Sequence, residues 1–147
     1  MLIIIPSIFE KLNQDGDFLW MIKSNKYKNY LFIFNDNIES KFLYNKGGGN
    51  AIIRPYTSNN PNIIVPSAIG IPTGSYENGG FSLLNEKTKQ YIDESILEIR
   101  KLILKYKYSG VIYSSDKNGI IGCGIFDVNK DVRNYITNKI YTLSELC

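Results

Sequence analysis

A short apolar run that breaks into polar residues limits the fold of this chain more than any other feature. Tyr30-Leu31-Phe32-Ile33-Phe34 is uninterrupted, and Asn35-Asp36-Asn37 follows it directly. A continuous apolar run of this length is typical of a strand that is buried on both faces, as in a sheet covered by helices. The triplet Gly47-Gly48-Gly49 comes ten residues after Asn37. We expect Asn50–Arg54 to form one or two helical turns that stop at Pro55.

Length and composition predict a single α/β domain over residues 1–147. The chain is 44% hydrophobic, which is ordinary for a globular protein. Its apolar start is interrupted by Pro6 and Glu10, and no run reaches the ~20 apolar residues of a membrane span. We therefore expect a cytoplasmic protein without a membrane partner. Heavy use of Asn, Ile, Lys and Tyr suggests an AT-rich genome, such as that of a virus or phage, which would place the protein in the host cytoplasm.

The composition also excludes several kinds of site. The chain has no histidine, so a Ser-His-Asp or Cys-His nucleophile and a His-ligated zinc site are excluded. Cys123 and Cys147 are too far apart for a CxxC motif. We expect no metal and no cofactor. The net charge is +3, and only three of the 17 basic residues are arginines, so the signal for nucleic acid is weak.

The remaining pattern alternates strands and helices along the chain. The strongest helix signal is Glu86–Tyr106, where Ile92, Ile96, Ile99 and Ile103 form one apolar stripe. Further expected strands are Leu2–Ile5, closed by Pro6, and Ile63–Val65, Ala68–Ile71, Gly110–Tyr113 and Lys139–Leu143. Further expected helices are Phe18–Lys26, capped by Asp17, and a last helix through Val132 and Ile136, capped by Asp127 or Asn129.

Two glycine-rich loops therefore follow two expected strands. Gly47–Gly49 follows the first strand described above, and Gly119–Gly124 follows Gly110–Tyr113. Ligands of open α/β sheets bind at the carboxyl ends of the strands. Glycine loops beside a helix start offer backbone N–H groups to an anion, so the two loops are expected to hold a diphosphate between them.

These motifs resemble the macro domain, the ADP-ribose-binding family, and small uncharacterised phage and viral proteins related to it. The resemblance rests on Gly16-Asp17-Phe18, on Phe34-Asn35-Asp36-Asn37, on Gly47-Gly48-Gly49-Asn50-Ala51-Ile52 and on Gly122-Cys123-Gly124-Ile125-Phe126. It implies a three-layer α/β/α fold with a mixed central sheet. The usual Asn-Ala-Ala-Asn stretch of the family is here Asn35-Asp36-Asn37-Ile38, with a charge in the middle.

The resemblance also implies roles for individual residues. Asp17 would accept a hydrogen bond from the adenine amino group, and Asn37 would contact the distal ribose. Gly47, Gly48 and Gly49 would form the first ligand loop. The second loop would cradle the phosphates through Gly122, Cys123, Gly124 and Ile125, and Phe126 would pack on the distal sugar.

The function implied is binding of ADP-ribose or a related NAD-derived nucleotide. An ADP-ribosyl hydrolase acting on an ADP-ribosylated macromolecule is one form of it, with water oriented by the candidate catalytic residues Asn37 and Asp36. A protein that sequesters the nucleotide without turnover is the second form. An interaction module with empty glycine loops is the third, in which the glycines are plain turns, Asp36 and Asn37 end a strand, and Asp17 only caps a helix.

Overall fold

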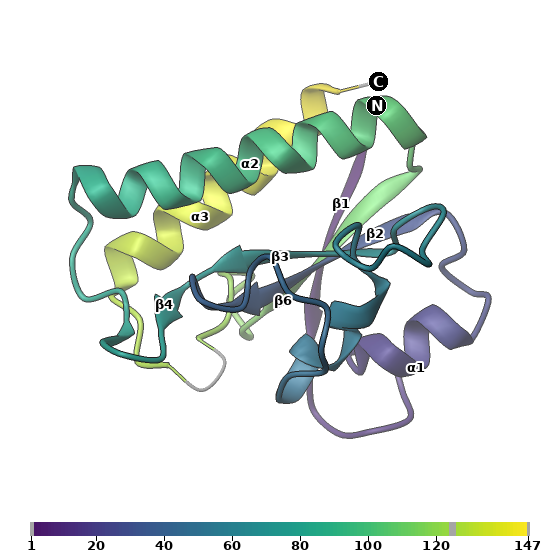
Figure 1. Ribbon diagram of the computed structural model, residues 1–147, viewed down its shortest axis with the longest axis horizontal. Helices are drawn as coiled ribbons and strands as arrows, with labels where there is room; N and C mark the ends of the chain where they lie inside the picture. The colour runs from purple at the N-terminus through teal and green to yellow at the C-terminus, as the bar shows by residue number, and fades with distance from the viewer. Residues whose placement is uncertain (1, 124–125, 147) are drawn as a thin grey trace.

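The fold is a parallel sheet covered by helices on both faces (Figure 1). The computed structural model describes residues 2–123 and 126–146. Its main sheet has the order β1-β6-β2-β3, with strands β1 (Ile3–Ile8), β6 (Gly110–Ser115), β2 (Tyr30–Asp36) and β3 (Ala68–Pro72). Every pairing in it is parallel, so the expected mixed sheet is wrong for this part. The antiparallel strands β4 (Gly74–Ser75) and β5 (Gly79–Gly80) form a separate small ribbon.

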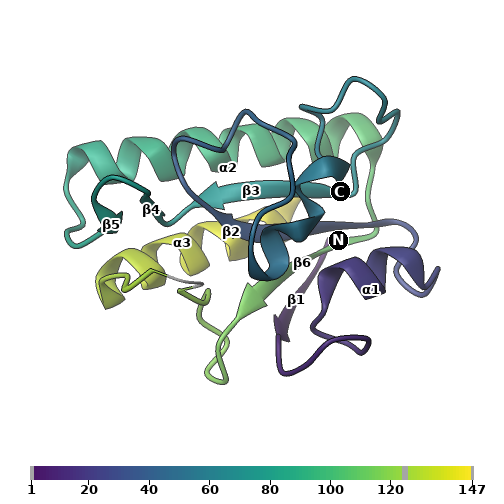
Figure 2. The same ribbon diagram turned by 60° about the horizontal axis from the view of Figure 1, so that its bottom comes forward.

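The central strand β2 supplies both hydrophobic cores, because its side chains alternate between the two faces of the sheet. Leu31 and Ile33 pack with α2 (Glu86–Tyr106) and α3 (Lys130–Thr142). Phe32 and Phe34 pack on the opposite face with α1 (Phe18–Lys23) and with the 3-10 helix η1 (Gly49–Tyr56). Figures 1 and 2 show α2 and α3 side by side on one face and α1 on the other. The expected layering of helices around an α/β sheet is therefore confirmed.

Side-chain caps set where the helices begin. Asn85 accepts a hydrogen bond from the Thr88 N–H (2.9 Å), so α2 has the predicted bounds. Asn129, and not Asp127, caps α3 by accepting from the Asp131 N–H (2.7 Å). Asp17 caps α1 as predicted. Of the helices in residues 2–123 and 126–146, none is long and apolar enough to cross a bilayer.

Two of the expected strands are wrong. Ile63–Val65 forms an irregular connection, and the Ile64 side chain is 88% exposed, so apolar composition alone did not produce a strand there. The segment Lys139–Leu143 continues α3 and enters the 3-10 helix η2 (Leu143–Glu145). Ile140 and Leu143 are buried three residues apart, which is a helical spacing.

Two prolines lie inside elements that they were expected to end. Pro6 is in the middle of β1, an edge strand whose Ile3 N–H bonds inward to Ser109 (3.3 Å). Because alternate residues of a strand turn to opposite sides, position 6 faces the open edge, where a missing N–H costs no ladder bond. Pro55 likewise lies inside η1, near its end, and does not stop it.

Candidate functional site

The sheet opens between β2 and β6 at the carboxyl ends of the strands. The β2–β6 pairing ends at Ile33↔Tyr113, whereas β1–β6 pairing continues to Ile8↔Ser115 and β2–β3 pairing to Asp36↔Pro72. The chain leaves β2 toward η1 on one face and leaves β6 toward α3 on the other. Neighbouring strands whose connections run to opposite faces form a topological switch point, the usual ligand crevice of an open α/β sheet.

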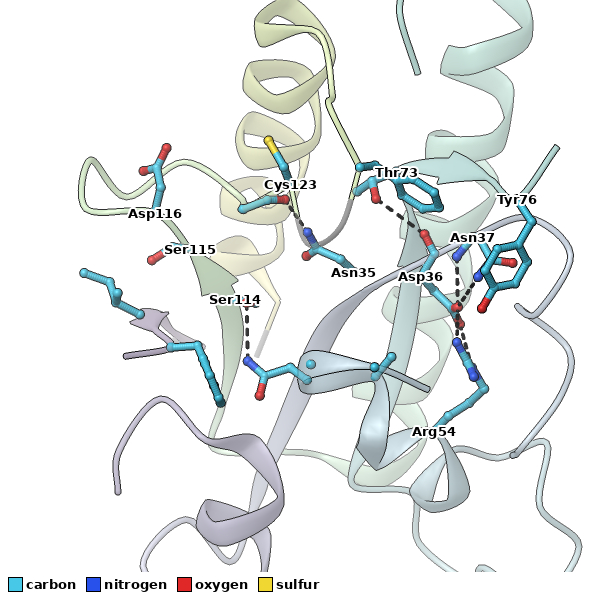
Figure 3. Close-up of a pocket in the computed structure, with 18 residues that line it drawn as sticks. Asn35, Asp36, Asn37, Arg54, Thr73, Tyr76, Ser114, Ser115, Asp116 and Cys123 are labelled. Carbon is cyan, nitrogen blue, oxygen red and sulfur yellow. Dashed lines mark hydrogen bonds and ion pairs between the residues drawn. The ribbon is translucent and has the colours of Figure 1, made fainter. Parts of the chain in front are cut away.

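A cavity of about 490 Å³ lies at this opening (Figure 3). It is lined by residues from the ends of β1, β2 and β6, from the segment after β3, from the start of η1 and from the loop after β6. The lining residues are Ile8, Phe9, Asn35, Asp36, Asn37, Gly48, Gly49, Asn50, Ala51, Arg54, Thr73, Tyr76, Ser114, Ser115, Asp116, Gly122, Cys123 and Phe126. Residues of both glycine-rich loops, Gly48 and Gly49 from the first and Gly122 and Cys123 from the second, therefore lie on the walls of one cavity.

Asp36 is held in a buried ion pair with Arg54. The Arg54 Nη2 and Nε atoms donate to Asp36 Oδ1 (2.6 Å) and Oδ2 (3.2 Å), and both side chains are 2% exposed or less. Asp36 Oδ1 also accepts from the Asn37 N–H (2.8 Å). Since the guanidinium occupies both carboxylate oxygens, Asp36 is poorly placed to take a proton from water, although it does line the cavity.

Asn37 lies beside Asp36, and the side-chain carbonyl of Asn37 already accepts a hydrogen bond within the protein. Asn37 Oδ1 accepts from the Ser40 N–H (2.8 Å), and this bond fixes the turn that follows β2. The Nδ2 group is 3.5 Å from Asp36 Oδ1, which is a long hydrogen bond. Figure 3 shows Asn37 and Tyr76 together at one side of the cavity. Asn37 therefore remains available to a ligand mainly as an amide donor.

The three glycines of the first loop have different surroundings. A Cβ at Gly47 would lie 2.8 Å from Ala51 Cβ and 2.9 Å from Arg54 Nη1, so Gly47 is packed and does not line the cavity. A Cβ at Gly48 or Gly49 would meet no atom of residues 2–123 and 126–146 within 4 Å, and both glycines line the cavity. Gly49 also has a φ of 54°, which favours glycine. Only Gly48 and Gly49 are therefore positioned as expected.

Asn50 fastens the start of η1 to its neighbours. Its Oδ1 accepts from the Phe18 N–H (3.0 Å), and its Nδ2 donates to the Gly16 carbonyl (3.2 Å) and to Ser114 Oγ (3.4 Å). These bonds join η1 to the start of α1 and to the end of β6. The Gly48–Gly49 segment is therefore anchored on a rigid frame.

The second loop contributes less backbone than expected. The Gly122 N–H donates to the Ser114 carbonyl (3.0 Å), so this donor is not free for a phosphate, and the Gly122 carbonyl accepts from Asn35 Nδ2. Cys123 and Phe126 do line the cavity. Gly124 and Ile125 lie outside the described residues.

Asp17 does not line the cavity. Its carboxylate accepts from the Asn13 N–H (2.9 Å) and the Trp20 N–H (3.5 Å), and the residue is 6% exposed. The structure therefore places Asp17 as a helix cap, and the expected contact with adenine has no support from its position.

Sequence reasoning missed several polar residues of the cavity, including Arg54, Thr73, Tyr76 and Ser115. Asn35 and Ser115 are on neighbouring strands, and Asn35 Oδ1 and Ser115 Oγ are buried without a hydrogen-bond partner among the described residues. A signal existed for Arg54, because it is one of only three arginines in the chain and directly follows the apolar run Ala51-Ile52-Ile53. Thr73, which follows β3, and Ser115, which ends β6, carried no such signal.

A second ion pair lies at the cavity wall, where the lining residue Asp116 pairs with Arg133 of α3. Burial alone would raise the pKa of the Asp116 carboxyl. Hydrogen bonds from the N–H groups of Asn118 and Ile120 and from Arg133 outweigh burial and hold that pKa below its ordinary value. Both lining carboxylates, Asp36 and Asp116, are thus paired with arginine, which reduces repulsion of an anionic ligand.

Comparisons with known proteins give no relative from which a function can be transferred. No protein-family model, no curated protein and no solved structure matches the chain. In the described residues, no group of three or more Cys, Asp or Glu side chains is placed to hold a metal ion.

Proposed function

We propose that this protein binds ADP-ribose or a related NAD-derived nucleotide in the cavity between β2 and β6, on a fold of the macro-domain type. The observation that carries the proposal is the Gly48–Gly49 segment. Among the described residues, no atom fills the space that a Cβ would take at either position, and both positions face the cavity. Bare backbone at the wall of a switch-point cavity is what close contact with a phosphate or ribose requires.

The size and chemistry of the cavity support this class of ligand. A volume of about 490 Å³ lies in the range of small-molecule sites. Gly48 is the residue before η1, and the first N–H groups of a helix have no acceptor within it. These N–H groups would bind the diphosphate. Phe9, which directly follows β1, and Tyr76, in the turn between β4 and β5, would contact the ends of the nucleotide.

Binding without turnover is the form of the function that the geometry favours. Both oxygens of Asp36 accept hydrogen bonds from Arg54, and Asn37 Oδ1 accepts from Ser40. A general base would need a free lone pair within reach of the attacking water. We therefore propose a protein that holds the nucleotide or an ADP-ribosylated partner, with hydrolysis as the alternative that an assay decides.

Calorimetric titration with ADP-ribose tests the proposal, with AMP and NAD as comparison ligands. Thermal unfolding gives a second readout, since a ligand at 100 times its Kd adds about 2.7 kcal/mol to the free energy of unfolding. Gly48→Leu should abolish binding without loss of stability, because its side chain enters open space in the cavity. Ser58→Leu, at an exposed turn position outside the cavity, is the matched control.

Absence of heat and of stabilisation with all three ligands would contradict the proposal and favour an interaction module. If binding occurs, incubation with an ADP-ribosylated protein separates the two forms of the function. Retention of the label indicates a binding protein, and its release indicates a hydrolase.

A further inference from the structure

The Asp36–Arg54 pair joins three segments around the cavity. Arg54 belongs to η1, and Asp36 ends β2. The third guanidinium nitrogen, Nη1, donates to the Asn45 carbonyl (3.0 Å), two residues ahead of Gly47. One guanidinium therefore connects the end of the central strand to the segment that enters the glycine triplet.

There is little room for this pair to shift. On one side, a Cβ at Gly47 would lie 2.9 Å from Arg54 Nη1. On the other side, a Cβ at Gly70 of β3 would lie 2.7 Å from Asp36 Oδ2. The Gly47 N–H is also bonded to the Ala51 carbonyl (3.1 Å), which closes the turn over the guanidinium. The position of Arg54 thus determines where the chain can pass at residues 45–47.

Stability alone does not account for such a pair. Removing two charges from water costs free energy, and well-packed apolar replacements of buried ion pairs are often as stable. A lysine would keep the charge, but its single ammonium group lacks the planar fork that serves Asp36 and Asn45 together. The combination of an arginine, a carboxylate and a backbone carbonyl therefore suits a geometric role.

We propose that Asp36 and Arg54 are positioning residues that hold the Gly48–Gly49 segment at the distance from β2 that a ligand in the cavity requires. This inference rests on the proposed function for its ligand. It assigns Asp36 a role different from the catalytic one expected from the sequence. Neither residue needs to touch the ligand, because both act through the course of the glycine segment.

The test compares Arg54→Lys with Lys41→Met as a matched control. Lys41 forms an ion pair with Glu98 (3.1 Å), its side chain is 10% exposed, and it does not line the cavity. Calorimetry with ADP-ribose should show an increase in Kd of about tenfold or more for Arg54→Lys, the equivalent of one buried hydrogen bond. Lys41→Met should bind as the wild type does. Amide hydrogen exchange at Gly47 and Ala51, whose N–H groups are bonded to the Ala51 and Gly48 carbonyls (3.1 and 3.0 Å), should become faster in Arg54→Lys only when it is measured without ligand.

A folded Arg54→Lys variant with wild-type affinity and unchanged exchange would overturn the inference. If that variant does not fold, Asp36→Leu combined with Arg54→Met removes both charges at similar volume, and wild-type exchange in this folded double variant would overturn it equally. If the wild-type protein does not bind ADP-ribose, the proposed function fails. The exchange experiment still decides the positioning role, because it is measured on the protein alone.

Discussion

The adjacent glycines Gly47 and Gly48 have different surroundings, because Gly47 is packed against other residues and Gly48 lies at the wall of the cavity. Alanine at position 47 places its Cβ 2.8 Å from Ala51 Cβ, beside a guanidinium that is fixed by Asp36. We expect Gly47→Ala to lower the free energy of unfolding by about 1–3 kcal/mol, as overpacking does. The Cβ of Gly48→Ala would meet no atom of the described residues within 4 Å, so this change should leave the free energy of unfolding unchanged. Urea unfolding of the two variants measures the difference, and equal values would contradict the assigned packing.

Asp116 makes the stability of the molecule depend on pH in the acid range. The folded-state pKa of this carboxyl is lowered, so its contribution is present above the ordinary value near 4 and is lost as pH falls through the folded pKa. We expect Asp116→Asn to be less stable than the wild type at neutral pH. The two unfolding free energies should converge below pH 4, and a gap that stays constant with pH would rule out this linkage.

At the scale of elements, the Asn85 cap accounts for the sharp start of α2. Its side chain satisfies the Thr88 N–H at 2.9 Å. We expect Asn85→Ala to cost about 1 kcal/mol of unfolding free energy, and Asn85→Asp to keep most of the wild-type value, because aspartate is an equally good cap. Thermal or urea unfolding followed by helix circular dichroism measures both. Equal losses for alanine and aspartate would show that the cap bond is not the cause.

The elements that the sequence predicted well are those with a strong local period. The stripe Ile92, Ile96, Ile99 and Ile103 fixed α2, and the run Tyr30–Phe34 located β2. The failures came where tertiary context decides. Ile63–Val65 has strand-like composition but no neighbouring strand to pair with, and Lys139–Leu143 belongs to the apolar face of α3.

The candidate site was predictable only in outline. Glycines that follow strand ends indicated the edge of the sheet where the cavity lies, but they did not reveal which backbone groups were free. The Gly122 N–H and carbonyl are hydrogen-bonded to Ser114 and Asn35. Gly47 is packed against Arg54, and Asp17 caps α1. The bonds of Gly122 and the packing of Gly47 depend on a partner on another strand or on exact backbone direction, which no local pattern shows, whereas the Asp17 cap was one of the alternatives that the sequence predicted.

The whole molecule is built as two hydrophobic cores that share one sheet. Cluster residues from β2 and β6 alternate between the cores, so Ile33 and Tyr113 belong to the core under α2 and α3, while Phe32 and Ile112 belong to the core under α1 and η1. Because both cores share β2 and β6, disruption of these strands on one side would expose the other core to water. This arrangement predicts that the domain unfolds as a single cooperative unit.

The single tryptophan of the chain makes this cooperativity measurable. Trp20 is on α1 and packs against the smaller core, whereas the circular dichroism signal is dominated by α2 and α3 on the opposite face. We expect fluorescence and circular dichroism to give the same urea midpoint. Ile99→Ala, a cavity-forming change in the larger core that should cost about 2–5 kcal/mol, should lower both midpoints together. If the fluorescence midpoint came at lower urea than the circular dichroism midpoint, or did not change in Ile99→Ala, the α1 side would unfold by itself.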